Sequence, residues 1–322
     1  MNIKHLVVTR LMICWNTQQL LSDIASYPDT RRAQERLNSR IKVLNNFYIP
    51  AMNSQTNDQF ENIFLIDRLH KDLDYSSFDF HKLNKCKILC LDSHRGAESA
   101  DGGAYLKEFY AQNPLVGKEK DHGFKTIELS NGIKKNIEIL CASSTNSDWE
   151  PGVSLELQSY LSQRSNDVDF FVTTRIDTDD AIQKNHIQNI QDVVYDKKTT
   201  MFIDHRKVLS AQIRNYSPPQ IKTFKEFSYH GRTATMMLST VFRPHEFEKY
   251  NCYRTGHNQI RRKFKTGHKI DTLGGLYLHW RGNMTKAIRL GCHTRLENTP
   301  EVKNLFPFLH DYDGVSNEHN FR

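Results

Sequence analysis

The stretch Asp169-Phe170-Phe171-Val172-Thr173-Thr174-Arg175-Ile176-Asp177-Thr178-Asp179-Asp180 is the strongest fold signal in this chain. Its apolar, β-branched first part predicts a buried strand. The strand ends in three carboxylates within four positions, which repel one another and lose hydration unless a cation neutralises them. This pattern favours a hard divalent metal, Mg²⁺ or Mn²⁺, with phosphate oxygens and water as its other ligands. The structural alternative is that Asp-Thr-Asp-Asp caps a helix beginning near Ala181.

Strands and helices alternate in the part of the chain that precedes this stretch. Three segments have the apolar character of strands: His5–Thr9, Glu61–Asp67 and Cys86–Asp92. Between the first two, Arg31–Phe47 carries apolar residues at helical spacing. The alternation predicts an α/β fold with a Rossmann-type, doubly wound and mostly parallel sheet.

Polar residues stand at the ends of the predicted strands. Arg10 follows the first strand, Asp67 and Asp92 end the next two, and Asp177–Asp180 follows the fourth. In doubly wound sheets, ligands bind beyond the carboxyl ends of the strands. Polar side chains at four such ends are the pattern that a nucleotide site would leave.

The other segments give weaker signals. Residues 93–150 are predicted to form a peripheral insertion or a flap over the site, with a hairpin turn at Asn131-Gly132. A helix is expected over Ile182–Val194. Further strands are expected near Met201–Asp204, Val208–Ile213, Met236–Phe242 and Gly275–Trp280. We expect a single domain over residues 1–290 and an irregular tail over 291–322.

The composition is ordinary for a soluble globular enzyme with a basic excess: 38% hydrophobic, 25% charged and a net charge of +7. The basic cluster at residues 261–265 suits an anionic partner such as a nucleotide diphosphate, an acidic glycan, a phospholipid surface or a nucleic acid. The six cysteines form no C-x-x-C pair and are expected to be free thiols. Without a leader pattern or a long apolar run, we expect a cytoplasmic protein, with peripheral contact at the inner face of a membrane as an option.

Residues 173–182 resemble the T-R-L-D-N-D-D-A motif of the putative rhamnosyltransferase family, a branch of the GT-A-type glycosyltransferases. His5–Arg10 and Arg40–Asp67 are similar to the opening strand, helix, turn and second strand of that family. Tyr253–His257 and Leu278–Asn283 resemble its late His and H-G-x-N elements. The resemblance runs from residue 5 to residue 285 and is poor over 93–163.

The chain departs from the family pattern at several positions. Ile176 and Thr178 replace the usual Leu and Asn, and Trp280-Arg281 is inserted around the expected glycine. The glutamate expected before the late His has no clear counterpart near Ser239–Arg243. These departures leave the catalytic base and the sugar specificity open.

The resemblance implies a GT-A-like single domain that transfers a sugar from a nucleotide diphosphate to a glycan or lipid-linked acceptor. The sugar would be L-rhamnose by the family name, and the donor dTDP-rhamnose or a UDP-sugar. A bound Mn²⁺ or Mg²⁺ would stabilise the leaving diphosphate. Nucleic acid is not an expected partner.

The resemblance also implies roles for single residues. Asp179 would be the direct metal ligand, Asp177 would hold metal-bound water or the ribose, and His279 would complete the metal shell unless it is a core histidine. Contacts to the nucleotide or diphosphate are expected from Thr9, Arg10, Asp67, Arg175, Asp177 and Asn283. Alternatively, Arg175 forms a salt bridge with the acidic cluster, and Thr9, Arg10 and Asp67 have structural roles at their strand ends. The candidates for the general base of an inverting reaction are Glu246 and His257, with Asp148 and Glu150 as further options.

Two other classes of protein fit the acidic stretch. A metal-dependent phosphohydrolase or nuclease would hold two cations with clustered aspartates and ligands such as Asp67, Asp92 and His279. A non-catalytic carbohydrate- or protein-binding module on a transferase fold is the other alternative. Metal-dependent protection by nucleotide diphosphates is expected of the transferase alone.

Overall fold

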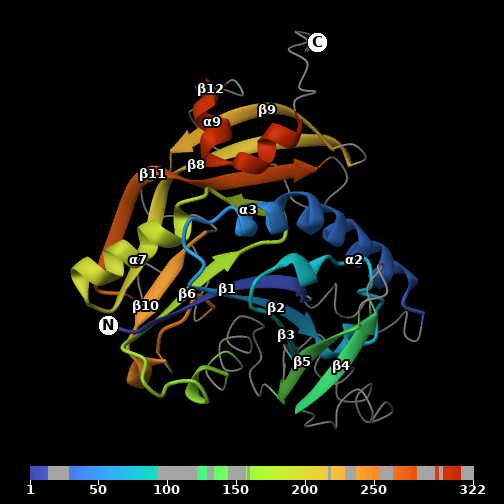
Figure 1. Cartoon of the computed structure of the whole chain (residues 1–322), viewed down its shortest axis with the longest axis horizontal. Helices are drawn as coiled ribbons and strands as arrows, with labels where there is room; N and C mark the ends of the chain where they lie inside the picture. The colour runs from blue at the N-terminus through green and yellow to red at the C-terminus, as the bar shows by residue number, and fades with distance from the viewer. Residues whose placement is uncertain are drawn as a thin grey trace, which may run out of the picture.

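Five parallel strands form the centre of the computed structural model, in the order β5-β3-β2-β1-β6 (Figure 1). Their bounds are β1 Ile3–Met12, β2 Glu61–Asp67, β3 Cys86–Asp92, β5 Lys134–Ser143 and β6 Phe170–Ile176. Every residue of β2 and β6 is buried, as expected of parallel strands that are covered on both faces. The structure describes residues 1–13, 29–92, 122–128, 134–143, 157, 160–216, 219–228, 237–247, 249–253, 264–280, 294–296 and 300–312.

Antiparallel strands extend this central group on both sides and lead into a second group. Strand β4 pairs with β5 at one edge, and β10 joins β6 to β8 at the other. Strand β8 continues into the second group, in the order β12-β9-β8-β11-β7. The bounds are β4 His122–Glu128, β7 Asp180–Ile182, β8 Met201–Tyr216, β9 Pro219–Ser228, β10 Ser239–Phe242, β11 Gly267–Trp280 and β12 Thr294–Leu296. The two groups therefore share one strand, β8.

A continuous helical segment lies between the two groups of strands (Figure 1). It consists of α2 (Arg31–Val43), the π-helical turn η1 (Leu44–Tyr48) and α3 (Ile49–Asn53). The stripe that packs on the central group contains Leu37, Ile41, Leu44 and Tyr48. The stripe that packs on β8 and β11 contains Val43, Phe47 and Ala51. A helix with two apolar stripes is typical of an element buried between layers.

The other face of the central group is covered by the chain around Tyr160 and Tyr253. These side chains share one hydrophobic cluster with Leu6 and Val8 of β1 and Leu65 of β2. Because both faces of the central strands are covered, the predicted α/β class is confirmed, with a parallel centre inside a mixed sheet.

The helix expected over Ile182–Val194 begins later than predicted. Asp180–Ile182 forms strand β7, and the helix α7 spans His186–Lys197. Residues 180–182 form a strand instead of a helix because Ala181 and Ile182 pair with the backbone of β11, where Gly275 permits close approach. A Cβ atom at Gly275 would lie 2.7 Å from the Ala181 carbonyl oxygen. The acidic stretch therefore does not cap a helix at Ala181.

Two further predictions change in detail. The two strands expected within residues 201–213 are one strand, β8. The predicted hairpin is present as β4 and β5, which pair from Glu128 with Lys134 up to His122 with Leu140. Because β5 also pairs with β3, this hairpin extends the edge of the sheet. The rest of the 93–150 segment lies outside the described residues.

Where it is described, the C-terminal segment is regular rather than irregular: strand β12 is followed by two helical pieces. It forms α9 (Pro300–Leu305) and the 3-10 helix η5 (Pro307–Tyr312). Phe306 is fully buried in the cluster that contains Phe47 and Leu209, and Phe308 meets Phe47 edge to face with ring centroids 6.3 Å apart. Sequence periodicity misses this segment because it is short and contains two prolines.

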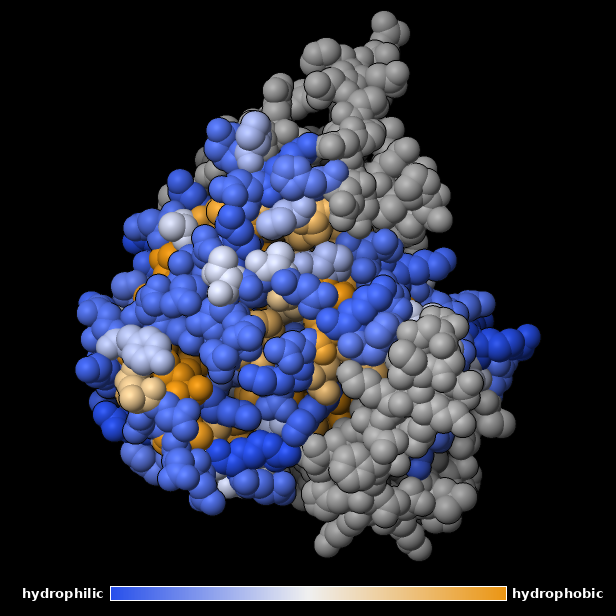
Figure 2. Space-filling model, viewed as in Figure 1, coloured by the Kyte–Doolittle hydropathy of each residue, from blue (hydrophilic) through white to orange (hydrophobic). Residues whose placement is uncertain are grey.

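The described surface is mainly polar. Figure 2 shows a largely hydrophilic face, and the large hydrophobic residues recorded as exposed are Met1 and Tyr195. Cys86, Cys90 and Cys252 are free thiols, as predicted. None of the helices among the described residues combines the length and the apolar character that a membrane crossing requires.

The buried C-terminal aromatic residues generate a prediction about stability. Phe306→Ala removes a fully buried ring, so we expect a loss of about 3–5 kcal/mol in the free energy of unfolding. Urea denaturation followed by tryptophan fluorescence measures this loss. Tyr195→Ala, at an exposed position of α7, is the control and should change stability by less than about 0.5 kcal/mol. Equal effects would show that the segment is not part of the core.

Three buried histidines make stability depend on pH. Burial lowers the pKa of His5 to about 3 and that of His205 to about 4. Burial, followed by the charge of His205, lowers the pKa of His186, whose ring stacks on His205 with centroids 4.4 Å apart. The unfolded chain takes up these protons near pH 6.5, roughly the free histidine value, before the folded protein does. Their contribution to stability is therefore complete above this pH and is lost as the pH falls.

We expect His205→Phe, which keeps an aromatic ring against His186, to weaken this pH dependence. Each histidine contributes at most about 1.4 kcal/mol per pH unit to the slope between its unfolded and folded pKa values. Urea titrations of wild type and variant at several pH values from about 7.5 to about 4.5 give the two slopes. Because all carboxylates are common to both proteins, parallel slopes would refute the assignment to His205.

Candidate functional site

The acidic turn, Asp177–Asp179, is the point where the chain passes from one group of strands to the other. It follows β6 of the central group and leads directly into β7 of the second group. The Asp180 amide donates to the Asp177 carbonyl at 3.2 Å, which closes the turn. The carboxylates are therefore held together at the carboxyl end of β6 by the connection itself, at the place where such sheets bind ligands.

Arg10 is ion-paired with the first carboxylate of the turn. Thr9 pairs with Ile176, so Arg10, the next residue of β1, lies beside Asp177, which directly follows β6. The Nη2 and Nε atoms of Arg10 lie 2.5 and 3.0 Å from Asp177 Oδ1. Strand β1 changes register against β2 between Arg10 and Met12, an irregularity that often occurs beside functional sites. Two of the four predicted polar strand ends, those of the first and fourth strands, therefore meet here.

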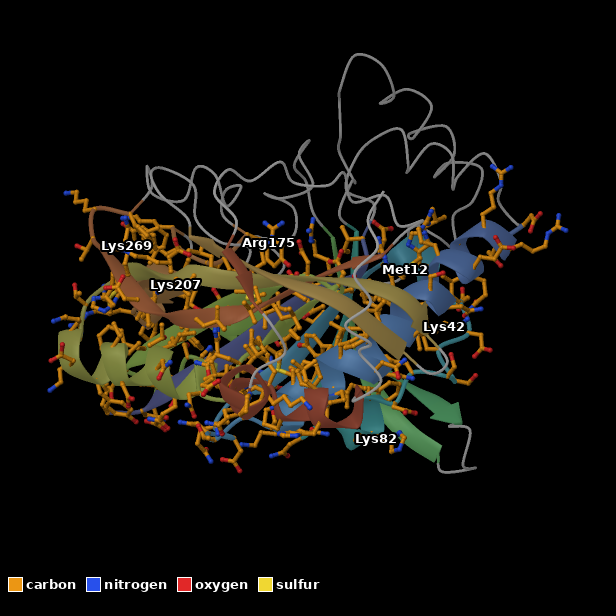
Figure 3. All side chains as sticks on the ribbon, turned by 90° about the horizontal axis from the view of Figure 1, so that it is seen from above. Met12, Lys42, Lys82, Arg175, Lys207 and Lys269 are labelled. Carbon is orange, nitrogen blue, oxygen red and sulfur yellow. The ribbon has the colours of Figure 1, made fainter. Side chains whose placement is uncertain are left out.

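Arg175 also approaches Asp177, from within the sheet. It is 3% exposed, and its Nε atom lies 3.8 Å from Asp177 Oδ1. Its guanidinium carbon lies 5.0 Å from the ring centroid of Tyr253, a cation–π arrangement. In Figure 3 the labelled Arg175 and Met12 both lie toward the upper edge of the view. The ion pair that was the alternative role for Arg175 is therefore present.

The two remaining carboxylates are poorly compensated. Burial and the neighbouring charge of Asp177 raise the pKa of Asp179 to about 6, against the opposing charges of Arg40 and Arg10. Burial, with the charges of Asp179 and Asp177, raises the pKa of Asp180 well above its usual range. Asp180 Oδ2 is buried without a hydrogen-bond partner. A cation beside Asp179 and Asp180 would relieve both the repulsion and the missing contact.

Strand β11 brings His279 toward the acidic turn. Tyr277 pairs with Asp180 in antiparallel register, so the backbone of His279 lies two residues further along β11, level with the turn. The same strand pairs His279 with Gln212 of β8. The predicted metal ligands Asp177, Asp179 and His279 thus come to one region through the pairing of β7 with β11.

Thr9 and Asp67 have structural roles in the described structure. Thr9 is fully buried, and its hydroxyl donates to the Tyr48 hydroxyl at 3.1 Å. Asp67 is 1% exposed, and its carboxylate accepts a hydrogen bond from the Leu69 amide at 3.1 Å. Thr9 therefore supports the end of β1 instead of lining an open pocket. A contact between Asp67 and a nucleotide stays a prediction.

Glu246 is not brought to the acidic turn, which corrects its assignment as a candidate base. It follows β10, whose Phe242 pairs with Phe171 at the start of β6. Since Asp177 follows the other end of this seven-residue strand, the separation is on the order of 20 Å. The carboxylate of Glu246 instead accepts hydrogen bonds from the Thr200 hydroxyl and the Arg243 amide, and so caps the turn η4 (Pro244–Glu246).

Two other predicted residues, His257 and Asn283, lie outside the described residues. Sequence reasoning missed two residues that the structure places at the site. Tyr253 supplies the aromatic face for Arg175, and Arg40 of α2 reaches the end of β1. Neither has a local sequence signal, because each reaches the acidic turn only through tertiary packing.

The residues at the turn fit a hard divalent cation in part. Asp179 and Asp180 offer oxygen ligands whose pKa values are raised by burial and by neighbouring carboxylates, and oxygen ligands suit Mg²⁺ or Mn²⁺. Asp177 is already engaged by Arg10 and is suited to an indirect role. Within the described part of the chain, no group of three or more His, Cys, Asp or Glu side chains is arranged to hold a metal. Further ligands would therefore have to come from other residues, the substrate or water.

The ion pair at the turn generates a testable prediction. Arg10→Met leaves the half-buried charge of Asp177 less compensated, so we expect a loss of about 2–4 kcal/mol in the free energy of unfolding. Adding Asp177→Asn should recover part of the loss, with a coupling energy of about 1–3 kcal/mol in a double-mutant cycle. The exposed pair Lys82–Asp79 is the control, with an expected coupling below about 1 kcal/mol. Equal coupling for the two pairs would contradict the role given to Arg10.

Comparison with known structures gives only distant likenesses. TarS from S. aureus aligns at 7% identity over 86% of this chain and 37% of its own, with a TM-score of 0.33. A structure of S. aureus TarS 1–349 in complex with UDP-GlcNAc aligns at 8% identity over 87% and 60% of the two chains, with a TM-score of 0.34. HddC from Yersinia pseudotuberculosis aligns at 8% identity over 87% and 90%, with a TM-score of 0.31. These scores are too low to support an argument, and the chain spans little more than a third of full TarS.

Comparison of sequences is more informative. No protein of curated function matches the chain. Residues 151–291 match the family described as "Putative rhamnosyl transferase". The match contains the acidic turn, His257, His279 and Asn283, whereas Arg10 and Asp67 lie outside it. The resemblance found from the motifs is confirmed over residues 151–291, which match this family.

Proposed function

We propose that the protein transfers a sugar from a nucleotide diphosphate donor to a glycan or lipid-linked acceptor, with the help of Mn²⁺ or Mg²⁺. The sugar is L-rhamnose by the name of the matched family, and the donor is dTDP-rhamnose or a UDP-sugar. One observation carries the proposal: the family match contains an acidic turn, at the carboxyl end of β6, whose carboxylates lack sufficient positive charge.

The chemistry of sugar transfer explains why such a turn is useful. Negative charge develops on the diphosphate as the bond to the sugar breaks, and a bound divalent cation supplies Lewis-acid stabilisation of that charge. Asp179 is the proposed direct ligand of the cation, and His279 is the proposed ligand from β11. Asp177, oriented by Arg10, is proposed to hold the ribose or the water around the cation. Asn283 is proposed to contact the diphosphate.

The acceptor side of the reaction requires a catalytic group of its own. An inverting transferase requires a general base near the acceptor hydroxyl. Since Glu246 lies near the far end of β6, His257 is the one that remains of the two main candidates. It follows Tyr253, which packs on Arg175, by four residues. We propose His257 as the base.

The alternative functions are less well supported. A nuclease with the basic cluster 261–265 as its binding surface would use Phe264 to stack on a base. Phe264 is instead 5% exposed and packs on Tyr250, with ring centroids 4.7 Å apart. Asp179 and Asp180 are crowded and have raised pKa values, a costly arrangement to retain in a module that only binds carbohydrate. Both alternatives are outcomes of the experiment below.

The proposal predicts that nucleotide binding depends on both the metal and Asp179. A ligand at about 100 times its dissociation constant adds about 2.7 kcal/mol to the stability of the folded state. We expect dTDP or UDP compounds with Mn²⁺ to raise the melting temperature of the wild type, and neither component alone to match this effect. Asp179→Ala should abolish the joint effect. Thermal-shift titration with a panel of nucleotides and nucleotide sugars measures it.

Asp196→Ala is the matched control, because Asp196 lies on the surface of α7 and its carboxylate is 69% exposed. This variant should respond to nucleotide and metal like the wild type. A wild type that folds normally and responds to no nucleotide would reject the transferase. Metal-dependent release of phosphate from a simple phosphomonoester would then favour the phosphohydrolase.

A further inference from the structure

Gln55 joins three elements that are far apart in the sequence. It lies just after α3, and its side chain is half-buried. Its Nε2 atom donates to two carbonyl oxygens, that of Ala51 in α3 and that of Gln183, at 3.0 Å each. Its Oε1 atom accepts a hydrogen bond from the Ile187 amide of α7 at 3.2 Å. Because two partners are acceptors and one is a donor, a single orientation of the side-chain amide satisfies all three.

The N-terminal end of α7 is capped from outside the helix. Its N-cap residue, Asn185, makes no side-chain cap hydrogen bond. The first amides of a helix have no acceptor within the helix, and Gln55 supplies one from 132 residues away in the sequence. The same side chain also binds a carbonyl near the C-terminal end of α3. Gln55 therefore ties the end of α3 to the beginning of α7.

The third bond of Gln55 holds the chain directly after β7. Strand β7 has three residues and pairs with β11, so it offers few hydrogen bonds of its own. Gln183 is the next residue, and its carbonyl is the one that Gln55 binds. The Thr56 amide donates to the following carbonyl, that of Lys184, at 2.9 Å. Since the acidic turn directly precedes β7, these bonds fix the downstream end of the segment that carries it.

We infer that Gln55 is a positioning residue of the acidic turn, and that its bond to the Gln183 carbonyl holds Asp179 where it binds the cation. The inference rests on the proposed function, which makes Asp179 the ligand of that cation. Upstream of Asp179, the ion pair with Arg10 fixes Asp177. Downstream, the position of β7 depends on β11 and on Gln55. Groups that orient a metal ligand without touching the metal typically change metal affinity about 10- to 100-fold when they are removed.

The competing explanation is that Gln55 only stabilises the packing of α3 on α7. Asn57 provides the matched comparison, because it is also half-buried and lies two residues further along the same loop. Its Nδ2 atom donates to the side chains of Gln188 and Gln191 in α7, at 2.9 and 3.1 Å. Asn57 thus ties the same loop to the same helix, but beyond Ile187 and away from β7. A purely structural role predicts the same consequences for the loss of either side chain.

The test compares wild type, Gln55→Met and Asn57→Leu by two measurements. The first is the dissociation constants of dTDP and UDP in the presence of Mn²⁺, determined by titration calorimetry. We expect Gln55→Met to weaken this binding about tenfold and Asn57→Leu to change it by less than about twofold. The second is hydrogen–deuterium exchange, which reports local opening of the backbone. Exchange over residues 180–183 should become about 2- to 10-fold faster in Gln55→Met, as expected for the loss of one hydrogen bond, and stay unchanged in Asn57→Leu.

Each outcome decides the question. Equal weakening of nucleotide binding in the two variants, or no weakening in Gln55→Met, would overturn the role of Gln55 and leave the proposed function intact. Unchanged exchange over residues 180–183 in Gln55→Met would overturn it as well. If the wild type binds neither nucleotide, the proposed function fails and the inference fails with it. If Gln55→Met does not fold, Gln55→Asn, whose neutral side chain is one methylene shorter, decides by the same comparison with Asn57→Leu.

Discussion

The site depends on three carboxylates that are held close together where the chain passes from β6 to β7. Asp177, Asp179 and Asp180 lie within four positions of the chain. They are held together because β6 is fixed by β1 and β10, β7 is fixed by β11, and this short segment is the direct connection between the two strands. The structure compensates the first carboxylate with Arg10 and leaves the others with raised pKa values. Burying these carboxylates close together costs stability, which a ligand that brings positive charge would offset.

The layers around the turn explain how this cost is tolerated. The helical segment from α2 to α3 packs on both groups of strands, and η5 closes the second group over Phe47. These buried apolar contacts hold the ends of β1, β6 and β11 in place independently of the charges at the turn. The ion pair between Arg10 and Asp177 then sets the direction in which the first carboxylate points. Rigid packing of this kind is what a preorganised binding site requires.

Much of the fold was predictable from local sequence patterns, whereas the features that depend on pairing between distant segments were not. Strands β2 and β3 match their predicted bounds, because apolar runs with polar ends are local signals. The strand β7 was missed, since Asp180–Ile182 is three residues long and is defined by its partner β11. Glu246 was misplaced for the same reason: its sequence gives no hint that β10 runs antiparallel to β6 and carries it away from the turn.

Arg10, Arg175 and Arg40 have different structural roles because they lie on different elements. Arg10 and Arg175 lie on strands that flank the turn, and their partners, Asp177 and Tyr253, hold them in fixed positions. Arg40 comes from a helix, and its guanidinium donates to the Leu11 carbonyl, which ties α2 to the end of β1. Arg10 and Arg175 thus hold the acidic turn within the sheet, and Arg40 fixes the helical layer against the first of these strands.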